Sequence, residues 1–380
     1  MSGSIWHITW EDIGSSSGGL GVACSELVEA LPESHVLVSA AGLIEGRESS
    51  YSSYYSDSAI AAVDYERALG KLVSGQLLPY AGIDQDVWRF NLALLGLKRG
   101  SLEALHVHDW HGILAAVALK RILKIPLVLH FHSTQRERLG GHVNDFISGL
   151  EQWGASQSDS LISVSNHAAA KLVRSFSIEP EKVRVVHNSS KFSNRLGNQL
   201  CEVRKRRVLF VGRLCEQKAP LFMVEVMRQL YSISNDYSFL FAGSGEELEK
   251  LQCVVDFYGF GAAVDWVEHQ SHCDVGQYYR DASFVCMTSY QEPFGLVALE
   301  AAQMGVPVLV TEQCGVAELL PSAPRFSLER AKSWSDYLHR AHVDAGYYFK
   351  ICKSLQKEAA SYTWQDAAEK VLAIYAKLLD

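Results

Sequence analysis

The segment Gln291-Glu-Pro-Phe-Gly-Leu-Val-Ala-Leu-Glu300, followed by Ala301-Ala-Gln-Met-Gly-Val-Pro-Val-Leu-Val310, carries the strongest structural signal in the chain. Proline disfavours helical geometry in the residue before it, so Pro293 keeps Glu292 in a loop. The residues after the proline are good helix formers and place Glu300 about five residues into a helix. A glycine and an apolar run follow, so the segment predicts a loop, a helix, a turn and a buried strand in succession.

The start of this predicted helix has the chemistry of a ligand site. The first N–H groups of a helix have no partner within it, and the positive end of the helix dipole attracts anions. We therefore expect the backbone of Phe294, Gly295 and Leu296 to approach a phosphate. Glu292 and Glu300 lie on either side of that helix end, and carboxylates bind hydroxyl groups. The expected ligand is a phosphorylated sugar.

Outside this segment, short apolar runs alternate with helical stretches, which is typical of α/β proteins with parallel sheets. We predict two doubly wound sheets that bind ligands at the carboxyl ends of their strands. A polar, glycine-containing hinge is predicted between Asn188 and Arg206. The predicted strands are Ile5–Trp10, His35–Ser39, Leu105–His108, Leu127–His130, Ser160–Val164, Val183–Val186, Val208–Val211, Phe239–Ala242, Val264–Val267, Phe284–Met287 and Val306–Val310.

Length and composition agree with this organisation. A chain of 380 residues with 48% hydrophobic content suits two domains with full interiors. The net charge of -8 excludes a global basic field that would attract nucleic acid. The cysteines are scattered without metal-binding spacing, and no signal peptide or membrane-spanning run is visible, which predicts a cytoplasmic protein with reduced thiols. Peripheral membrane contact stays open, because a surface helix can provide it.

Two cations follow a predicted strand end in the second half of the chain. Arg213 comes directly after the strand and its glycine, and Lys218 follows a few residues later. Both are placed to neutralise a diphosphate as it leaves, although an ordinary pair of loop charges is the alternative. Glycines at two other strand ends allow close approach of the backbone to phosphate: Gly18 and Gly19 in the first half, and Gly243 in the second.

Two histidine-containing segments end strands in the first half. His132 ends the run Leu127-Val-Leu-His-Phe-His132, where a histidine is either a structural hydrogen-bonding group or part of a reaction centre, with His130 as the second candidate. The stretch His106-Val-His-Asp-Trp-His111 has the histidine density of a metal site. Because strand residues alternate faces and no second group of ligands is evident, we instead predict a loop of the substrate cleft and no bound metal. Asp109 and Trp110 are candidates for acceptor contact, and Trp110 equally for core packing.

These motifs resemble a known enzyme family. The segment from Glu292 to Glu300 resembles the Glu-x7-Glu signature of retaining glycosyltransferases with the GT-B fold, chiefly glycosyltransferase family four (glycosyl transferases group 1). Val208-Leu-Phe-Val-Gly-Arg-Leu214, followed by Lys218, is similar to the family's strand end and its lysine. Thr311 to Leu320 resembles the loop that closes the donor pocket.

The N-terminal half adds a partial likeness to glycogen and starch synthases. Gly18-Gly-Leu-Gly21 and the segment His106 to His111 carry it, but Ser16 stands where the synthases have a lysine. With these segments included, the resemblance spans most of the chain.

The resemblance implies an α/β architecture of two Rossmann-like, doubly wound parallel-sheet domains that face a cleft. Residues 1–195 would form the acceptor-side domain, residues 196–360 the nucleotide-sugar donor domain, and residues 361–380 a helix that crosses back to the N-terminal domain. The implied reaction is the retaining transfer of a hexose from a nucleoside diphosphate sugar (a UDP-, GDP- or ADP-sugar) to an acceptor hydroxyl. No cofactor or metal is required in that reaction.

The family also implies roles for individual residues. Catalysis is assigned to His132, Arg213, Lys218 and Glu292. Donor binding is assigned to Gly18, Gly19, Gly243, Phe294, Gly295, Leu296 and Glu300, the last through the ribose hydroxyls.

Two other functions stay open. An α-glucan synthase is favoured by the glycine loop and the histidine segment, but opposed by Ser16 and Phe294. A catalytically silent nucleotide-sugar sensor is favoured by Pro321-Ser-Ala-Pro-Arg-Phe326, which replaces the family's glycine-led strand, and by Cys314, where the family often has glycine. The residues leave open whether the acceptor is a glycan, a lipid, a protein or a small molecule.

Overall fold

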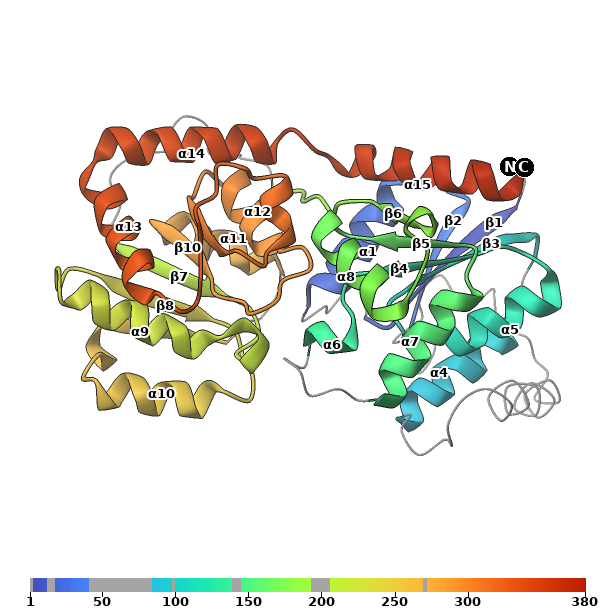
Figure 1. Cartoon of the computed structure of the whole chain (residues 1–380), viewed down its shortest axis with the longest axis horizontal. Helices are drawn as coiled ribbons and strands as arrows, with labels where there is room; N and C mark the ends of the chain where they lie inside the picture. Colours follow the sequence, from blue (N-terminus) through green and yellow to red (C-terminus); the bar gives the residue numbers. More distant parts are fainter. Residues whose placement is uncertain are drawn as a thin grey trace. The chain divides into compact units, whose positions relative to one another are not determined.

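The computed structural model describes residues 3–11, 18–40, 84–97, 100–138, 145–192, 206–268 and 272–380 (Figure 1). The chain forms two compact units. Unit 1 comprises residues 1–136, 141–188 and 364–380, and unit 2 comprises residues 137–140 and 189–363. The predicted domain boundary at residues 195 and 196 lies outside the described residues, so it stays a prediction.

Unit 1 is built on a parallel sheet of six strands in the order β2-β1-β3-β4-β5-β6. The strand order reverses between β1 and β3, and open α/β sheets bind ligands beside such a switch point. The strands are β1 Ser4–Thr9, β2 His35–Ser39, β3 Leu102–His108, β4 Leu127–Phe131, β5 Ser160–Ser163 and β6 Val183–Val185. The helices of this half are α1 Gly19–Ala30, α4 Gln85–Gly96, α5 Ile113–Leu123, α6 Gln135–Arg138, α7 Asp145–Gln157, α8 Asn166–Phe176 and the 3-10 helix η1 Pro180–Lys182. The C-terminal helix α15, Trp364–Leu379, also belongs to unit 1 and lies side by side with α1 (Figure 1).

The two faces of this sheet bury different side chains. On one face, Leu105, Val107 and their neighbours form the main apolar core with α4, α5 and α7. Because successive strand residues point to opposite faces, His106 and His108 point the other way. On that side Tyr375 of α15 lies 2.5 Å from Nδ1 of His106. A parallel sheet is normally apolar on both faces, so a buried histidine face is unusual.

Unit 2 has a second parallel sheet, in the order β12-β11-β10-β7-β8-β9, with its switch point between β7 and β10. The strands are β7 Arg207–Val211, β8 Ser238–Ala242, β9 Val264–Val267, β10 Phe284–Met287, β11 Val308–Thr311 and β12 Arg325–Phe326. The helices are α9 Pro220–Tyr231, α10 Leu248–Phe257, α11 His272–Asp281, α12 Leu296–Gln303, α13 Ala331–Val343 and α14 Ala345–Ala359, with 3-10 helices η2 Glu216–Lys218, η3 Gly261–Ala263 and η4 Gly315–Glu318. The prediction of two doubly wound parallel sheets is confirmed.

One expectation about unit 2 needs correction. The sequence from Pro321 to Phe326 replaces the glycine-led strand sequence of the family, yet its last two residues form β12 and pair in parallel with β11. The sheet edge beyond β11 is therefore covered, and this segment no longer distinguishes a sensor from an enzyme.

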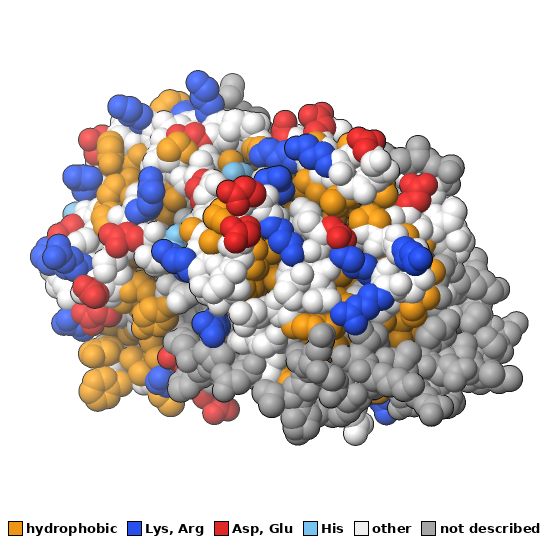
Figure 2. All heavy atoms as spheres, turned by 45° about the vertical axis from the view of Figure 1, so that its right-hand side comes forward, with side chains coloured by type: hydrophobic (Ala, Val, Ile, Leu, Met, Phe, Trp, Pro, Cys, Tyr) orange, Lys and Arg blue, Asp and Glu red, His pale blue; other side chains and the backbone are white. Residues whose placement is uncertain are grey.

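One face of the described surface carries mixed charge. On the face shown in Figure 2, Lys and Arg side chains alternate with Asp and Glu, and hydrophobic side chains lie between them. No helix among the described residues combines the length and the apolar character needed to cross a bilayer.

Adding a methyl group at two glycines of α7 should have opposite effects on the free energy of unfolding. A Cβ at Gly149 would meet nothing within 4 Å, whereas a Cβ at Gly154 would lie 2.7 Å from two side-chain carbons of the buried Ile113. Alanine is favoured over glycine inside helices, so Gly149→Ala should raise the free energy of unfolding by about 0.5–1 kcal/mol. Gly154→Ala should lower it by about 1 kcal/mol or more, because Ile113 must move. Urea unfolding measures both values, and equal effects of the two substitutions would contradict this packing.

Candidate functional site

A lysine and a glutamate meet beyond the carboxyl ends of β7 and β10, at the switch point of unit 2. Lys218 is the last residue of η2, and Glu292 lies in the loop after β10. The ammonium Nζ of Lys218 is 2.5 Å from Oε2 of Glu292, and the hydroxyl of Ser289 donates to the same oxygen at 3.0 Å. Oε1 of Glu292 has no hydrogen-bond partner among the described residues, which leaves it available to a ligand.

Backbone contacts fix both members of this pair. The hydroxyl of Thr288, directly after β10, donates to the carbonyl of Lys218 at 2.9 Å. The N–H of Glu292 donates to the carbonyl of Gln313 at 3.1 Å, and the Glu292 carbonyl accepts from the N–H of Gly315 at 2.9 Å. The ends of three central strands therefore position the pair.

The loop-to-helix prediction for the following residues is confirmed. Gly295 caps α12 with a φ of 108°, a conformation that favours glycine. Before it, the Phe294 carbonyl accepts from the N–H of Val316 at 2.7 Å and from the thiol of Cys314 at 3.3 Å. Burial, and next the Glu292 carboxylate, raise the pKa of the Cys314 thiol, so this thiol stays protonated and can donate. Cys314, which departs from the family's glycine, thus helps to hold the loop at the start of α12.

Glu300 is buried rather than solvent-facing. It is 4% exposed on α12, and its Oε2 accepts a hydrogen bond of 2.7 Å from the hydroxyl of Tyr279 on α11. Burial and the neighbouring Glu300 raise the pKa of Tyr279 well above its ordinary value, so the hydroxyl remains a donor. Tyr279 was not among the predicted site residues, because nothing in its local sequence marks it.

Gln217, which the sequence did not single out, connects Arg213 to the loop after β10. The Arg213 guanidinium lies 3.4 Å from Oε1 of Gln217, and the Gln217 amide donates to the carbonyl of Gln291 at 3.1 Å. Close packing of β7 and β8 supports this region, since a Cβ at Gly243 would lie 1.9 Å from the carbonyl oxygen of Gly212. Glycine is therefore required at residue 243 for steric reasons.

In unit 1, His132 directly follows β4. Its backbone N–H donates to Oδ1 of Asp109 at 2.7 Å, and its ring Nε2 lies 2.9 Å from Nδ1 of His108. Asp109 is 2% exposed and holds the backbone at His132, which corrects the expectation that Asp109 contacts an acceptor. Trp110 packs in the core of unit 1. His106 and His108 lie in β3, in agreement with the predicted strand Leu105–His108, but both are fully buried, which corrects their expected place in the substrate cleft.

The glycine loop of unit 1 lies beside a carboxylate. Gly18 precedes α1 and Gly19 begins it, and the N–H of Gly21 donates to Oε2 of Glu11 at 2.8 Å. This carboxylate occupies the helix end where an anion would bind and disfavours a phosphate there. The ligand contacts of Gly18 and Gly19 stay a prediction.

Family descriptions match both halves of the chain. Residues 17–189 match Glycosyltransferase Family 4, and residues 198–337 match Glycosyl transferases group 1. The uncharacterized glycosyltransferase MJ1607 of Methanocaldococcus jannaschii is 26% identical over 308 residues, which cover 75% of this chain and 77% of that protein. A glycogen synthase of Mycobacterium tuberculosis and a D-inositol 3-phosphate glycosyltransferase of Mycobacterium bovis align over only 53% and 51% of their own length.

Many solved structures have a fold similar to that of this chain. Sucrose-phosphate synthase from Thermosynechococcus elongatus has a TM-score of 0.79 at 18% identity, over 99% of each chain. Anabaena Alr3699/HepE, in complex with UDP and glucose, has a TM-score of 0.74 at 14% identity, over 99% of this chain and 100% of that one. Identity this low establishes a shared fold and no more.

Proposed function

Since this chain belongs to the GT-B glycosyltransferases of family 4, we propose that it transfers a hexose from a nucleoside diphosphate sugar to an acceptor hydroxyl with retention of configuration. The carrying observation is the contact between Lys218 and Glu292, 2.5 Å long, beside the start of α12. It joins a cation, a carboxylate and a helix end at the switch point of one sheet, where phosphate and sugar hydroxyl groups both find partners.

The diphosphate is the group that this arrangement stabilises. An ammonium group has three donors, and Lys218 uses one of them on Glu292. The others, with the guanidinium of Arg213 and the first N–H groups of α12, face the charge that develops as the sugar–phosphate bond breaks. Glu292 keeps the ammonium in place and offers Oε1 to a hydroxyl of the hexose. No metal ion is needed in this scheme, because the two cations and the helix dipole supply positive charge.

The nucleoside is bound by neighbouring residues. Glu300, held by Tyr279, accepts hydrogen bonds from the ribose hydroxyls. Gly243 allows the backbone after β8 to approach the nucleotide. The UDP bound to Anabaena HepE supports a UDP-sugar as the first donor to test. His132 keeps the role in the reaction centre that the family resemblance predicts.

A donor panel tests the proposal. The purified chain is incubated with UDP-, GDP- and ADP-glucose, and release of the nucleoside diphosphate is followed with and without EDTA. We expect slow release from one donor, unchanged by chelation, because water replaces the missing acceptor. Strong stimulation by added glycogen would favour an α-glucan synthase. Tight nucleotide binding without release from any donor, with or without acceptor, would favour a silent sensor and contradict the proposal.

A further inference from the structure

Histidines from four neighbouring strands lie together on one face of the unit 1 sheet. Their strand neighbours, such as Ile8 and Val107, pack in the main apolar core, and successive strand residues point to opposite faces, so the histidines point away from that core. Each is buried, with at most 6% of the residue exposed. We call this group the histidine face, and its members are His35 on β2, His7 on β1, His106 and His108 on β3, and His130 on β4.

Helix α15 covers the histidine face through Tyr375. The Tyr375 hydroxyl lies 2.5 Å from Nδ1 of His106 and 3.4 Å from Nε2 of His7. The Tyr375 ring centre lies 5.4 Å from that of His35. Tyr375 is 0% exposed, and burial raises its pKa well above the ordinary value, so the hydroxyl keeps its proton. One side chain of α15 therefore contacts histidines of three strands.

Burial keeps the histidine face neutral. Burial, with neighbouring histidines adding to the effect, lowers the pKa of the four members on β1, β3 and β4 well below the ordinary value. Burial also lowers the pKa of His35 to about 4. Rings that water reaches bind protons at their ordinary pKa of about 6.5. Between pH 7 and pH 5 an open face therefore binds more protons than a closed one, so acidification favours opening.

Other ionisable groups surround the face. Burial raises the pKa of the Cys24 thiol on α1 well above the ordinary value, so the thiol stays neutral, and Asp109 and Glu11 add to this effect. Glu26 of α1 accepts a hydrogen bond of 2.6 Å from the indole N–H of Trp364, the first residue of α15. The charged side chains of α15 itself are exposed. Histidine is the residue type in this set that ordinarily changes charge between pH 8 and pH 5.

The closed arrangement has little room for extra protons. Nδ1 of His35 lies 3.0 Å from Nε2 of His7, and Nδ1 of His7 lies 3.2 Å from Nε2 of His108. A neutral imidazole donates at one nitrogen and accepts at the other, whereas an imidazolium donates at both. Two imidazolium rings in this row would put two hydrogens between facing nitrogens, or would require His7 to accept at both nitrogens. The closed row therefore holds one extra proton at most.

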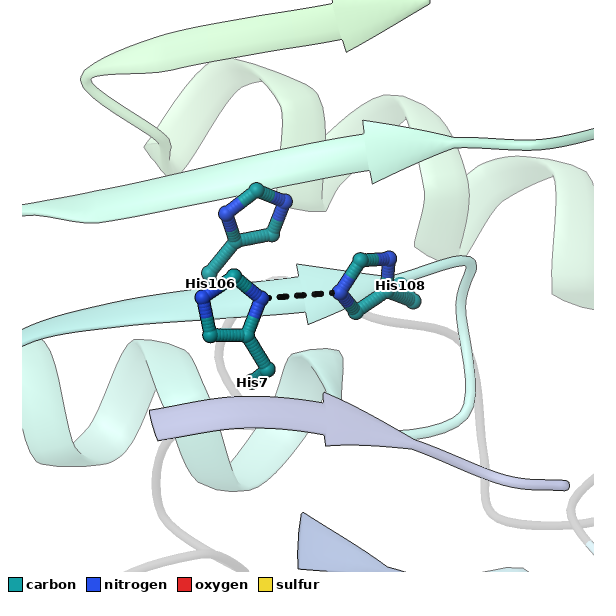
Figure 3. A group of neighbouring side chains, drawn as sticks. All are labelled: His7, His106 and His108. Atoms are coloured by element: carbon teal, nitrogen blue, oxygen red, sulfur yellow. Dashed lines mark hydrogen bonds between the residues drawn. The ribbon is translucent and has the colours of Figure 1, made fainter. Parts of the chain in front are cut away.

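A metal site is the competing interpretation, since His7, His106 and His108 each offer a nitrogen within 4.8 Å of the others (Figure 3). Metal ligands must aim their in-plane lone pairs at one point. His106 instead stacks on His7 at 4.5 Å and 25°, and on His108 at 4.6 Å and 16°. Nearly parallel rings do not converge in this way, and nitrogens of His7 and His108 already face each other. A hydrogen-bonded group of neutral rings is the better description.

Helix α15 is the element whose release uncovers the face at the lowest cost. Strands β1 to β4 are joined by backbone hydrogen bonds, and α1 lies between β1 and β2 in the chain. The backbone hydrogen bonds of a helix are internal, and α15 follows α14 of unit 2 in the chain. Release of α15 therefore leaves the sheet intact, and such local opening requires less free energy than global unfolding.

We propose that α15 and the histidine face form a pH-sensitive latch, in which α15 is closed at neutral pH and is released reversibly on acidification. Tyr375 holds the latch closed, and the three histidines that it contacts, His7, His35 and His106, are the sensors. The latch does not depend on the proposed function, because every group in it belongs to unit 1 and no ligand takes part.

The number of sensors sets the size of the effect. A histidine that is neutral in the closed state and has an ordinary pKa in the open state raises the opening constant about tenfold between pH 7.5 and pH 5.5. Three sensors should therefore raise it about 1000-fold. The sign follows from proton binding: the stability of the closed state is complete above the ordinary pKa and is lost as the pH falls through it.

Hydrogen exchange of the full chain, measured by mass spectrometry at pH 7.5 and pH 5.5, tests the latch. Rates are corrected for the pH dependence of exchange itself, and α15 is compared with α5, which packs in the apolar core of the same unit. We expect the opening constant of α15 to rise about 1000-fold and that of α5 to rise far less. A rise of less than about threefold in α15 would overturn the latch. So would an equal rise in α5, because unit 1 would then unfold as a whole.

Two substitutions separate the sensors from Tyr375. The readout is the ratio of the α15 opening constants at the two pH values, in which packing changes that are equal at both values cancel. His106→Asn keeps an amide group beside the Tyr375 hydroxyl but does not titrate, so the ratio should fall about tenfold. Tyr375→Phe removes only the hydroxyl, so it should raise opening about fivefold at both pH values and leave the ratio unchanged.

Two further variants are matched controls. His342→Asn replaces a buried histidine of unit 2, and Glu26→Gln removes the carboxylate that contacts Trp364. Both should leave the ratio for α15 unchanged. An unchanged ratio in a folded His106→Asn variant, or a tenfold lower ratio in Glu26→Gln, would overturn the assignment of the sensors. If His106→Asn does not fold, the comparison of α15 with α5 in the unmodified chain still decides the proposal.

Discussion

Replacing Lys218 by methionine is expected to lower the rate of sugar-donor turnover by about 100- to 1000-fold. In other enzymes, the loss of one hydrogen-bonding group that stabilises developing charge has an effect of this size. The ammonium is the half-buried cation at the switch point of unit 2, and it is held 2.5 Å from Glu292. Methionine keeps most of the side-chain length but offers no charge to the departing diphosphate. Steady-state release of nucleoside diphosphate from the preferred donor measures the effect.

The same substitution also affects stability, and the two effects must be separated. Lys218→Met leaves the Glu292 carboxylate, whose side chain is 10% exposed, without its cation, which should cost about 3 kcal/mol of unfolding free energy. The double variant Lys218→Met with Glu292→Gln removes both charges and keeps an amide oxygen for the Ser289 hydroxyl. We expect it to recover most of the stability and none of the turnover.

A lysine outside the site completes this experiment. Lys250 on α10 is exposed and lies 3.6 Å from Glu247, so Lys250→Met should leave turnover unchanged. If turnover per folded molecule returned in the double variant, the ion pair would serve folding alone, and the proposed stabilisation of the diphosphate would be wrong.

The local structure of the candidate site in unit 2 was predictable from the sequence, because its signals are local. Pro293 and the helix-forming residues after it fix the loop, the start of α12 and the place of Glu300 within a few residues. The strand pattern also located Lys218 after β7. What local signals could not show is that Lys218 and Glu292 contact each other, because that contact depends on β7 and β10 being neighbours in the sheet.

The histidine face of unit 1 escaped prediction for the same reason. Sequence reasoning singled out the two pairs His106 and His108, and His130 and His132, but could not show that they contact one another or that His7 and His35 lie beside them. Only the parallel register brings His7 and His35 into line with them. The structure places His106 and His108 in the interior of unit 1, whereas the sequence analysis expected them in the substrate cleft.

Residues that support the candidate site through side-chain hydrogen bonds were also invisible in the sequence. Thr288, Gln217 and Tyr279 each donate a hydrogen bond to a candidate site residue or its loop. Serine, threonine, glutamine and tyrosine make such contacts throughout proteins, so composition and spacing carry no specific signal for them.

Glu300→Gln is expected to weaken UDP binding about tenfold to a hundredfold, because hydrogen bonds from two ribose hydroxyls to a carboxylate become bonds to a neutral amide. The substitution keeps an oxygen that can accept from the Tyr279 hydroxyl, so the contact between α11 and α12 survives.

A change of ligand isolates the ribose contact. UDP that lacks its 2′ and 3′ hydroxyls should bind the unmodified protein more weakly than UDP does, and should bind the variant about as well as UDP does. Calorimetric titration of both ligands into both proteins gives the four affinities. An equal loss of affinity for the two ligands in Glu300→Gln would mean that the carboxylate acts through the packing of α12, and the ribose assignment would then be wrong.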